Sequence, residues 1–287
     1  KMICKHIIKK YNYCFLYRSD LLYSSDMSLV IYTNASGDYS HTEGINTEAK
    51  GNGSHAEGNV TKALGKYSHA EGEDTNALGY CSHTEGIETN ALCYCSHAEG
   101  SNTTASGKYS HSEGSNTTAS GNGSHSEGNN TEAKGNGSHS EGNNTLAKGN
   151  GSHSEGKDTL ADGNYSHSEG KDTEASGNCS HAEGNNTLAD GNGSHAGGYS
   201  TIADYDNMTA IGKYNIPNDD ELITIRKNKL FVVGNGNEEN RMDAFIITEK
   251  GDVFIQHDLH IDNDLIIKGD LYVNGVIHCK KIIEDVK

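Results

Sequence analysis

A His-x-Glu pair recurs along most of this chain, and it is the pattern in the sequence best suited to chemistry. An imidazole beside a carboxylate can exchange a proton, form an ion pair or ligate a divalent metal. The pairs return every 14 residues in the unit Ser-His-(Ala/Ser/Thr)-Glu-Gly-x-x-Thr-x-Ala-x-Gly-x-x. The histidines are His41, His55, His69, His83, His97, His111, His125, His139, His153, His167, His181 and His195. The glutamates are Glu43, Glu57, Glu71, Glu85, Glu99, Glu113, Glu127, Glu141, Glu155, Glu169 and Glu183, and their column continues with Gly197 and Ile211.

A strict period without insertion or deletion is typical of a stacked repeat protein, in which each unit buries its surface against its neighbours. Ser, the small residue and Gly at repeat positions one, three and five should share one face of a strand, because side chains alternate. Thr, Ala and Gly at positions eight, ten and twelve should share one face of a second strand. We therefore predict a flattened coil with a narrow interior, glycine turns with positive φ, and outward His and Glu ladders.

The composition agrees with a thin solenoid and excludes several classes of protein. Among the 287 residues, only 32% are hydrophobic, Trp is absent and 35 are Gly, so a conventional core is not expected. The net charge of −17 argues against nucleic acid as a partner. The sequence holds no apolar run long enough for membrane insertion, and no signal peptide is recognised in its basic start. Seven cysteines without a regular spacing predict reduced thiols and assembly in the cytoplasm.

Three parts are predicted along the chain. Residues 1–26 form a basic extension, either a short helix or a disordered tail. Residues 27–215 hold the repeats, and residues 216–287 have a different pattern. There, strands are expected at Leu222–Ile225 and Leu230–Val233, and a hairpin at Ala244–Thr248 and Val253–Gln256. A six-residue repeat of the type Asp-Leu-x-Ile follows. One chain with this pattern would bury too little apolar surface alone, so we predict a β stem made of three chains.

The repeat resembles the YadA-like head of trimeric autotransporter adhesins, whose unit reads Ser-Val-Ala-Ile-Gly-x-x-Ala-x-Ala-x-Gly-x-x. The similarity covers residues 27–215, and Met208-Thr209-Ala210-Ile211-Gly212 comes near to that unit. The resemblance implies a left-handed parallel β-roll, three chains around one axis and a surface-binding role. The later segments Leu230–Gly236, Asp243–Ile247 and Gly251–Val253 are similar to the stretch that follows such heads in phage and virus fibre or neck-appendage proteins.

The sequence departs from this family where the family places Val and Ile at the trimer seam, because it has His and Glu there. Many unpaired buried carboxylates would be very costly, so the ladders must pair, meet water or face outward. We expect His–Glu pairing across the seam, with His partly protonated near neutral pH by its carboxylate neighbours. A divalent metal is the alternative, but zinc sites usually use a few converging ligands rather than many identical rungs. No metal or other cofactor is therefore predicted.

We expect an all-β, homotrimeric fibre or surface-appendage protein of a virus or phage that binds a host-surface receptor, matrix or glycan and catalyses no reaction. Its expected location is the virion or an extracellular appendage, and the absence of a recognised signal peptide or anchor favours a virus over a bacterial adhesin. Viral against bacterial origin, the receptor and the distal end stay open. A metal-binding scaffold built on the ladders is one alternative. An acyltransferase-type enzyme on a left-handed β-helix is less favoured, because its period would be six residues.

Overall fold

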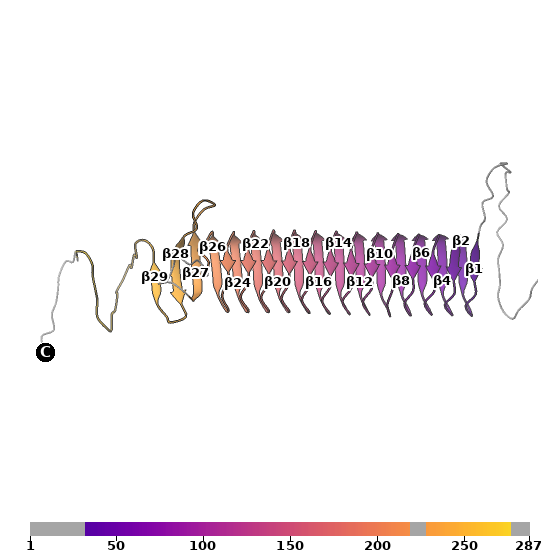
Figure 1. The fold of residues 1–287 in the computed structure, drawn as a ribbon, viewed down its shortest axis with the longest axis horizontal. Helices are drawn as coiled ribbons and strands as arrows, with labels where there is room; N and C mark the ends of the chain where they lie inside the picture. Colours follow the sequence, from indigo (N-terminus) through magenta and orange to yellow (C-terminus); the bar gives the residue numbers. More distant parts are fainter. Residues whose placement is uncertain (1–31, 219–227, 277–287) are drawn as a thin grey trace, which may run out of the picture.

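A computed structural model describes residues 32–218 and 228–276, and the regular elements in these ranges are all β-strands. The strands form a long rod of stacked coils, with β1 at one end and β27 to β29 at the other (Figure 1). The predictions for residues 1–26 and for a strand at Leu222–Ile225 lie outside the described residues. The prediction of an all-β parallel solenoid with a small antiparallel region after it is confirmed.

Two sheets run along the rod. The 13-stranded sheet contains β1 (Thr33–Ala35), β3 (Thr47–Ala49), β5 (Lys62–Ala63), β7 (Asn76–Ala77), β9 (Asn90–Ala91), β11 (Thr104–Ala105), β13 (Thr118–Ala119), β15 (Glu132–Ala133), β17 (Leu146–Ala147), β19 (Leu160–Ala161), β21 (Glu174–Ala175), β23 (Leu188–Ala189) and β25 (Ile202–Ala203). The 16-stranded sheet contains β2 (His41–Ile45), β4 (His55–Asn59), β6 (His69–Glu73), β8 (His83–Ile87), β10 (His97–Ser101), β12 (His111–Ser115), β14 (His125–Asn129), β16 (His139–Asn143), β18 (His153–Lys157), β20 (His167–Lys171), β22 (His181–Asn185), β24 (His195–Tyr199), β26 (Thr209–Lys213), β27 (Lys229–Asn235), β28 (Asp243–Thr248) and β29 (Val253–Ile255).

Each coil supplies one strand to each sheet, and neighbouring coils pair in parallel with equivalent residues side by side. His97 lies beside His111, and Ala105 lies beside Ala119. Every repeat column therefore becomes a straight row along the rod, so a residue type that recurs in the sequence forms a continuous stripe in space.

Alanine, serine and threonine fill the interior between the two sheets, as predicted. The Ala column that includes Ala105 and Ala119 is completely buried, and so is the small residue that follows each described histidine from Ala56 onward. In the coils with Ser at that place, a hydroxyl pair joins the sheets, as between Ser112 Oγ and Thr117 Oγ1 at 2.7 Å. Side chains this small let the sheets approach closely and give the interior the density that stabilises a folded chain.

The two glycine columns have different roles, and two predictions about them are wrong: position five does not face the interior, and position twelve has no positive φ. Gly128 at position five has a φ of 110° and is exposed, although it was expected to face the interior. Its positive φ breaks the side-chain alternation, and an added Cβ would lie 2.2 Å from the Gly142 carbonyl oxygen. Gly121 at position twelve is buried without positive φ, and its Cβ would lie 1.9 Å from the Gly135 oxygen. Close stacking, rather than turn geometry, favours glycine at position twelve, although Cys93 and Tyr205 occupy this column in two coils.

The chain turns at positions seven and fourteen, where the backbone of every described coil is left-handed. Asn tolerates this conformation better than other non-glycine residues, and Asn130 and Asn144 adopt it with φ near 54° and 57°. The side chains form rows, in which Asn130 Nδ2 donates to Asn144 Oδ1 at 2.7 Å. Val60 is unusual in this column, because β-branched residues rarely adopt the left-handed conformation, yet Val60 has a φ of 60°.

The carboxyl-terminal end of the rod is closed by β27 to β29. β27 pairs in parallel with β26, and the antiparallel pairs β27–β28 and β28–β29 confirm the predicted hairpin. The other sheet ends at β25, where the Asn215 side chain acts as the next strand would. Its Oδ1 accepts from Ile202 N and its Nδ2 donates to Ile202 O, both at 2.8 Å. The Asn215 side chain therefore covers backbone groups at the edge of the short-strand sheet, and β29 forms the edge of the other sheet.

A buried ion pair fastens this cap. Lys229 Nζ lies 2.9 Å from Asp243 Oδ2, and their side chains are 0% and 1% exposed. Lys229 Nζ also donates to Ile216 O at 2.6 Å, and Asp243 Oδ1 accepts from Ile216 N at 2.9 Å. The pair thus fixes the chain that leads out of β26 against β27 and β28.

Beyond β29 the described chain leaves the rod as an extended segment, visible as the trace between β29 and the C label in Figure 1. Residues 256–276 contain no strand in the single chain, so the predicted β stem stays a prediction. Their apolar side chains are exposed, including Leu259 at 61%, Leu265 at 62% and Leu271 at 61%.

Candidate functional site

The His and Glu columns lie side by side on the outer face of the 16-stranded sheet. Each His is the first residue of its strand and each Glu is the third, so the buried small residue between them points inward. The strand register brings all twelve predicted histidines into one row and all eleven glutamates into another. Gly197 and then Ile211 continue the Glu row. We call this surface the His–Glu ladder.

The imidazole rings form a continuous stack. From His55 to His195, neighbouring ring centroids are 4.7–5.0 Å apart and the rings are within 12° of parallel. The first pair, His41 and His55, is tilted by 53°. The separation equals the spacing of hydrogen-bonded strands, because each ring is carried by its own strand.

Ten of the eleven carboxylates, all except Glu85, lie within 4.0 Å of an imidazole of the same chain. The distance from Nε2 to the glutamate oxygen is 3.4 Å in His97–Glu99, His111–Glu113 and His139–Glu141, and 3.5 Å in four other coils. The arrangement shifts toward the cap, where Glu169 lies between His167 at 3.9 Å and His181 at 3.7 Å. Pairing within one chain is therefore available without the partner chain that the sequence prediction invoked.

The ladder leaves buried nitrogen atoms without hydrogen bonds. In the coils after the first, about two thirds of each ladder histidine side chain is covered, as in His97 at 34% exposed, and in ten of these histidines the Nε2 atom itself is sealed from solvent. These Nε2 atoms have no hydrogen-bond partner within the chain in His55, His69, His83, His97, His111, His125, His139, His153, His167 and His181. Ten aligned nitrogens that face carboxylates without bonding to them are the unusual chemical feature of this surface.

The ladder disfavours the charged form of histidine. Burial lowers the pKa of five of them, and the neighbouring imidazoles lower it further because adjacent imidazolium rings repel. The facing carboxylates raise the same pKa values, but less strongly. These five are His55, His97, His111, His153 and His181. The prediction that Glu keeps His partly protonated near neutral pH is wrong for them, since burial and stacking outweigh the carboxylates.

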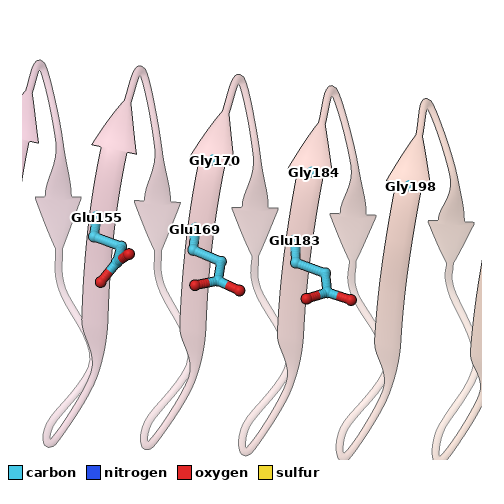
Figure 2. Close-up of a pocket in the computed structure, with 6 residues that line it drawn as sticks. All are labelled: Glu155, Glu169, Gly170, Glu183, Gly184 and Gly198. Carbon is cyan, nitrogen blue, oxygen red and sulfur yellow. The ribbon is translucent and has the colours of Figure 1, made fainter.

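An open groove of about 460 Å³ follows the Glu row near its end. Figure 2 shows the side chains of Glu155, Glu169 and Glu183 on three successive strands, with Gly170, Gly184 and Gly198 above them. The glycine column leaves the backbone bare beside the carboxylates. The groove therefore offers a line of anionic oxygens that an approaching cation can reach from solvent.

A second surface, which the sequence reading missed, lies on the turns that follow the short strands. There, leucines replace the Ser and Lys of later coils, and tyrosines replace their Asn and Gly. Tyr80 and Tyr94 stack at 5.1 Å, and Tyr67 and Tyr109 pack edge-on against them. This Tyr–Leu edge contains Leu64, Tyr67, Leu78, Tyr80, Leu92, Tyr94 and Tyr109, which are 37–64% exposed. The signal in the sequence was the local replacement of polar residues in columns eleven, thirteen and fourteen.

Comparison with protein-family models and with characterised proteins gives no match for this chain. In the part of the chain that the structure describes, there is no helix that could cross a membrane. The cysteines at 81, 93, 95 and 179 are free thiols.

Proposed function

We propose that the protein is a homotrimeric fibre or surface-appendage protein of a virus or phage, which attaches to a host surface and catalyses no reaction. Its coils would form a left-handed β-roll with the His–Glu ladder at the trimer seam, and residues 256–276 would wind with two other copies into a stem. The resemblance to YadA-like heads supports this arrangement. The location on a virion or extracellular appendage belongs to the same proposal.

The exposed apolar side chains beyond β29 carry the proposal. Leu259, Leu265 and Leu271 stand six residues apart and are about three-fifths exposed in one chain. Ile261, Ile267 and Val273 follow each of them two residues later and are 40–46% exposed. Solvent exposure of so regular an apolar pattern is unfavourable, and identical copies can cover it because each presents the same spacing.

The Tyr–Leu edge supports the attachment role. It lies on the turns of the coils rather than in the His and Glu rows, and its side chains are exposed, so we propose that it stays open in a trimer joined at the ladder. Tyrosine and leucine are effective contact residues, and an exposed cluster of them typically marks an interaction surface. We propose a glycan or protein of the host surface as its partner. The net charge of −17 disfavours nucleic acid.

Light scattering on the full chain tests the assembly. A trimer gives a mass three times 30.7 kDa. The triple variant L259D/L265D/L271D should dissociate it, because charges cannot be buried in the stem. The matched control, L64D/L78D/L92D, places the same three charges on the Tyr–Leu edge and should keep the trimer. A monodisperse wild-type monomer would refute the proposal.

The same control variant tests attachment. Wild-type protein applied to an array of immobilised cell-surface glycans and to immobilised host envelope proteins should be retained, whereas L64D/L78D/L92D should be retained at least tenfold less. Equal retention of both would remove the Tyr–Leu edge from the proposal.

A further inference from the structure

We infer that the His–Glu ladder binds divalent transition-metal ions, Zn²⁺ foremost, with each ion held by side chains of two successive coils. The ligand atoms of His97, Glu99 and His111 lie within 4.8 Å of one another. The described residues contain eight such groups of metal-ligating side chains, among them the His-Glu-His groups centred on Glu57, Glu71, Glu113 and Glu127. The inference goes beyond the attachment function and needs only one chain, because each group is formed within a single copy.

The His–Glu spacing already fits a shared ion. Two ligand atoms at about 2.1 Å from a tetrahedral Zn²⁺ are separated by about 3.4 Å. The observed separations are 3.4 Å in His97–Glu99 and 3.5 Å in His125–Glu127. An ion can therefore lie between Nε2 and the carboxylate oxygen without any movement of the backbone.

The unbonded Nε2 atoms point to the same conclusion. In ten histidines this atom is buried, faces a carboxylate and has no hydrogen-bond partner. A hydrogen bond would satisfy such an atom, and so would a metal ion. Neutral imidazole is the form that ligates metals, and burial and stacking in the ladder favour that form.

The second histidine of each group reaches the ion by a rotation of its ring. Parallel rings whose centroids are 4.8 Å apart, as in His111 and His125, are too widely spaced for one tetrahedral ion, which needs about 3.4 Å between its nitrogens. The imidazole rotates easily about its outer torsion, which has a broad energy well. His41 and His55, at the end of the stack, are already tilted by 53°.

Charge and ligand sharing set the number of ions. Neighbouring groups share a histidine, so His111 serves either the group with Glu99 or the group with Glu113. At most half of the eight groups can be filled, which gives about four ions per chain. Two coils supply two carboxylates, which neutralise one divalent ion. Ions on alternate pairs of coils would be about 10 Å apart, at twice the strand spacing.

Equilibrium dialysis of the full, untagged chain against Zn²⁺, followed by elemental analysis, tests the inference. The expected result is about four Zn²⁺ per chain, with Co²⁺ giving the intense visible absorption of a tetrahedral site. E57Q/E71Q removes the carboxylates of the two groups that share His69, and should lose about one ion per chain and a matching part of the absorption. The matched control, E132Q/E174Q, changes two glutamates of the other sheet and should bind as the wild type does.

Two results would overturn the inference. One is binding of less than one Zn²⁺ per chain, and the other is unchanged binding by E57Q/E71Q, which would mean adsorption on histidines alone. Circular dichroism of each variant verifies that it is folded, and these isosteric changes are on half-exposed side chains. Oligomeric mass measured on the same samples separates a failure of ion binding from a failure of the trimer proposal.

Discussion

The repeated coils and the segment after β29 differ in how far their apolar side chains are buried. In the coils, even small side chains such as Ala105 and Ala119 are completely buried, because an identical coil covers each side. In the segment, the much larger Leu259 and Leu265 are about three-fifths exposed in one chain. A repeat is covered by its own sequence neighbours, whereas the segment has no neighbour to stack on. The coils thus cover their own apolar surface, whereas the apolar side chains of the segment stay exposed in one chain.

The cap between these two regions is chemically different from both. It joins the coils to the segment through an ion pair, Lys229–Asp243, that is almost fully buried. The packing of small residues is repeated in every coil, so the loss of one contact leaves many others. The Lys229–Asp243 pair occurs once, and each partner is buried without compensation if the other is removed. The predictions below test this contrast, from the largest expected effect to the smallest.

Removal of the cap cation should have the largest effect. K229M leaves the Asp243 carboxylate buried without its partner, which should lower the free energy of unfolding by about 3–5 kcal/mol in urea denaturation. K250M removes an exposed lysine of the hairpin turn and serves as the matched control, with little change expected. The double variant K229M/D243L should recover much of the loss. Equal midpoints for K229M and K250M would contradict the role of the pair.

Inside the coils, replacing glycine by alanine should cost more stability where the glycine is closely packed than where the space around it is open. G128A adds a Cβ at a φ of 110° and 2.2 Å from the Gly142 carbonyl oxygen, and should cost about 2–4 kcal/mol. G123A, at a φ of 64° with nothing within 4 Å, should cost about 1–2 kcal/mol. Thermal unfolding of the two variants compares them directly. A greater loss in G123A would mean that backbone strain, not stacking, selects glycine.

Acid should weaken the coils more than the cap. The pKa of His97, His111 and three other ladder histidines is lowered in the folded state by burial and by the neighbouring imidazoles. The unfolded chain then binds more protons than the folded chain, so stability is full above the ordinary pKa of about 6.5 and falls as the pH drops below it. Urea denaturation in chelator between pH 8 and 5 measures this. A flat profile between pH 7 and 5 would contradict it.

The smallest effect is expected at Val60. Its φ of 60° is unfavourable for a β-branched side chain, and Asn occupies the equivalent place in many coils. V60N should therefore raise the free energy of unfolding by about 1 kcal/mol. The reverse change in the same column, N130V, should lower it by a similar amount. If V60N is destabilising, packing of Val60 against its neighbours must outweigh the backbone strain.

Much of the fold could be predicted because the sequence repeats every 14 residues without insertion or deletion. A constant period places every residue beside its equivalent, so the Ala and Thr columns had to be interior and the His–Glu pairs had to form rows. The hairpin formed by β28 and β29 could also be predicted, since two strand-like segments flank a turn sequence. Position five was predicted wrongly, because a positive φ at Gly128 interrupts the alternation on which the argument depended.

The chemistry of the site could be predicted only in part. Residue types and spacing identified all the members of the ladder, but not the separation between ring and carboxylate or the burial that lowers the histidine pKa values. The Tyr–Leu edge was missed because its residues come from three columns, and only the turn geometry brings Tyr80 next to Tyr67 and Tyr109.

By itself, the sequence determined the solenoid, the membership of each row and the polarity of each face, because these follow from periodicity alone. Only the tertiary structure decided the contacts between segments that share no period. Asn215 completes the edge of the short-strand sheet, and Lys229 meets Asp243 inside the cap. The physical reason is that a repeat specifies its own neighbours, whereas a unique contact depends on how two different stretches of chain fold onto each other.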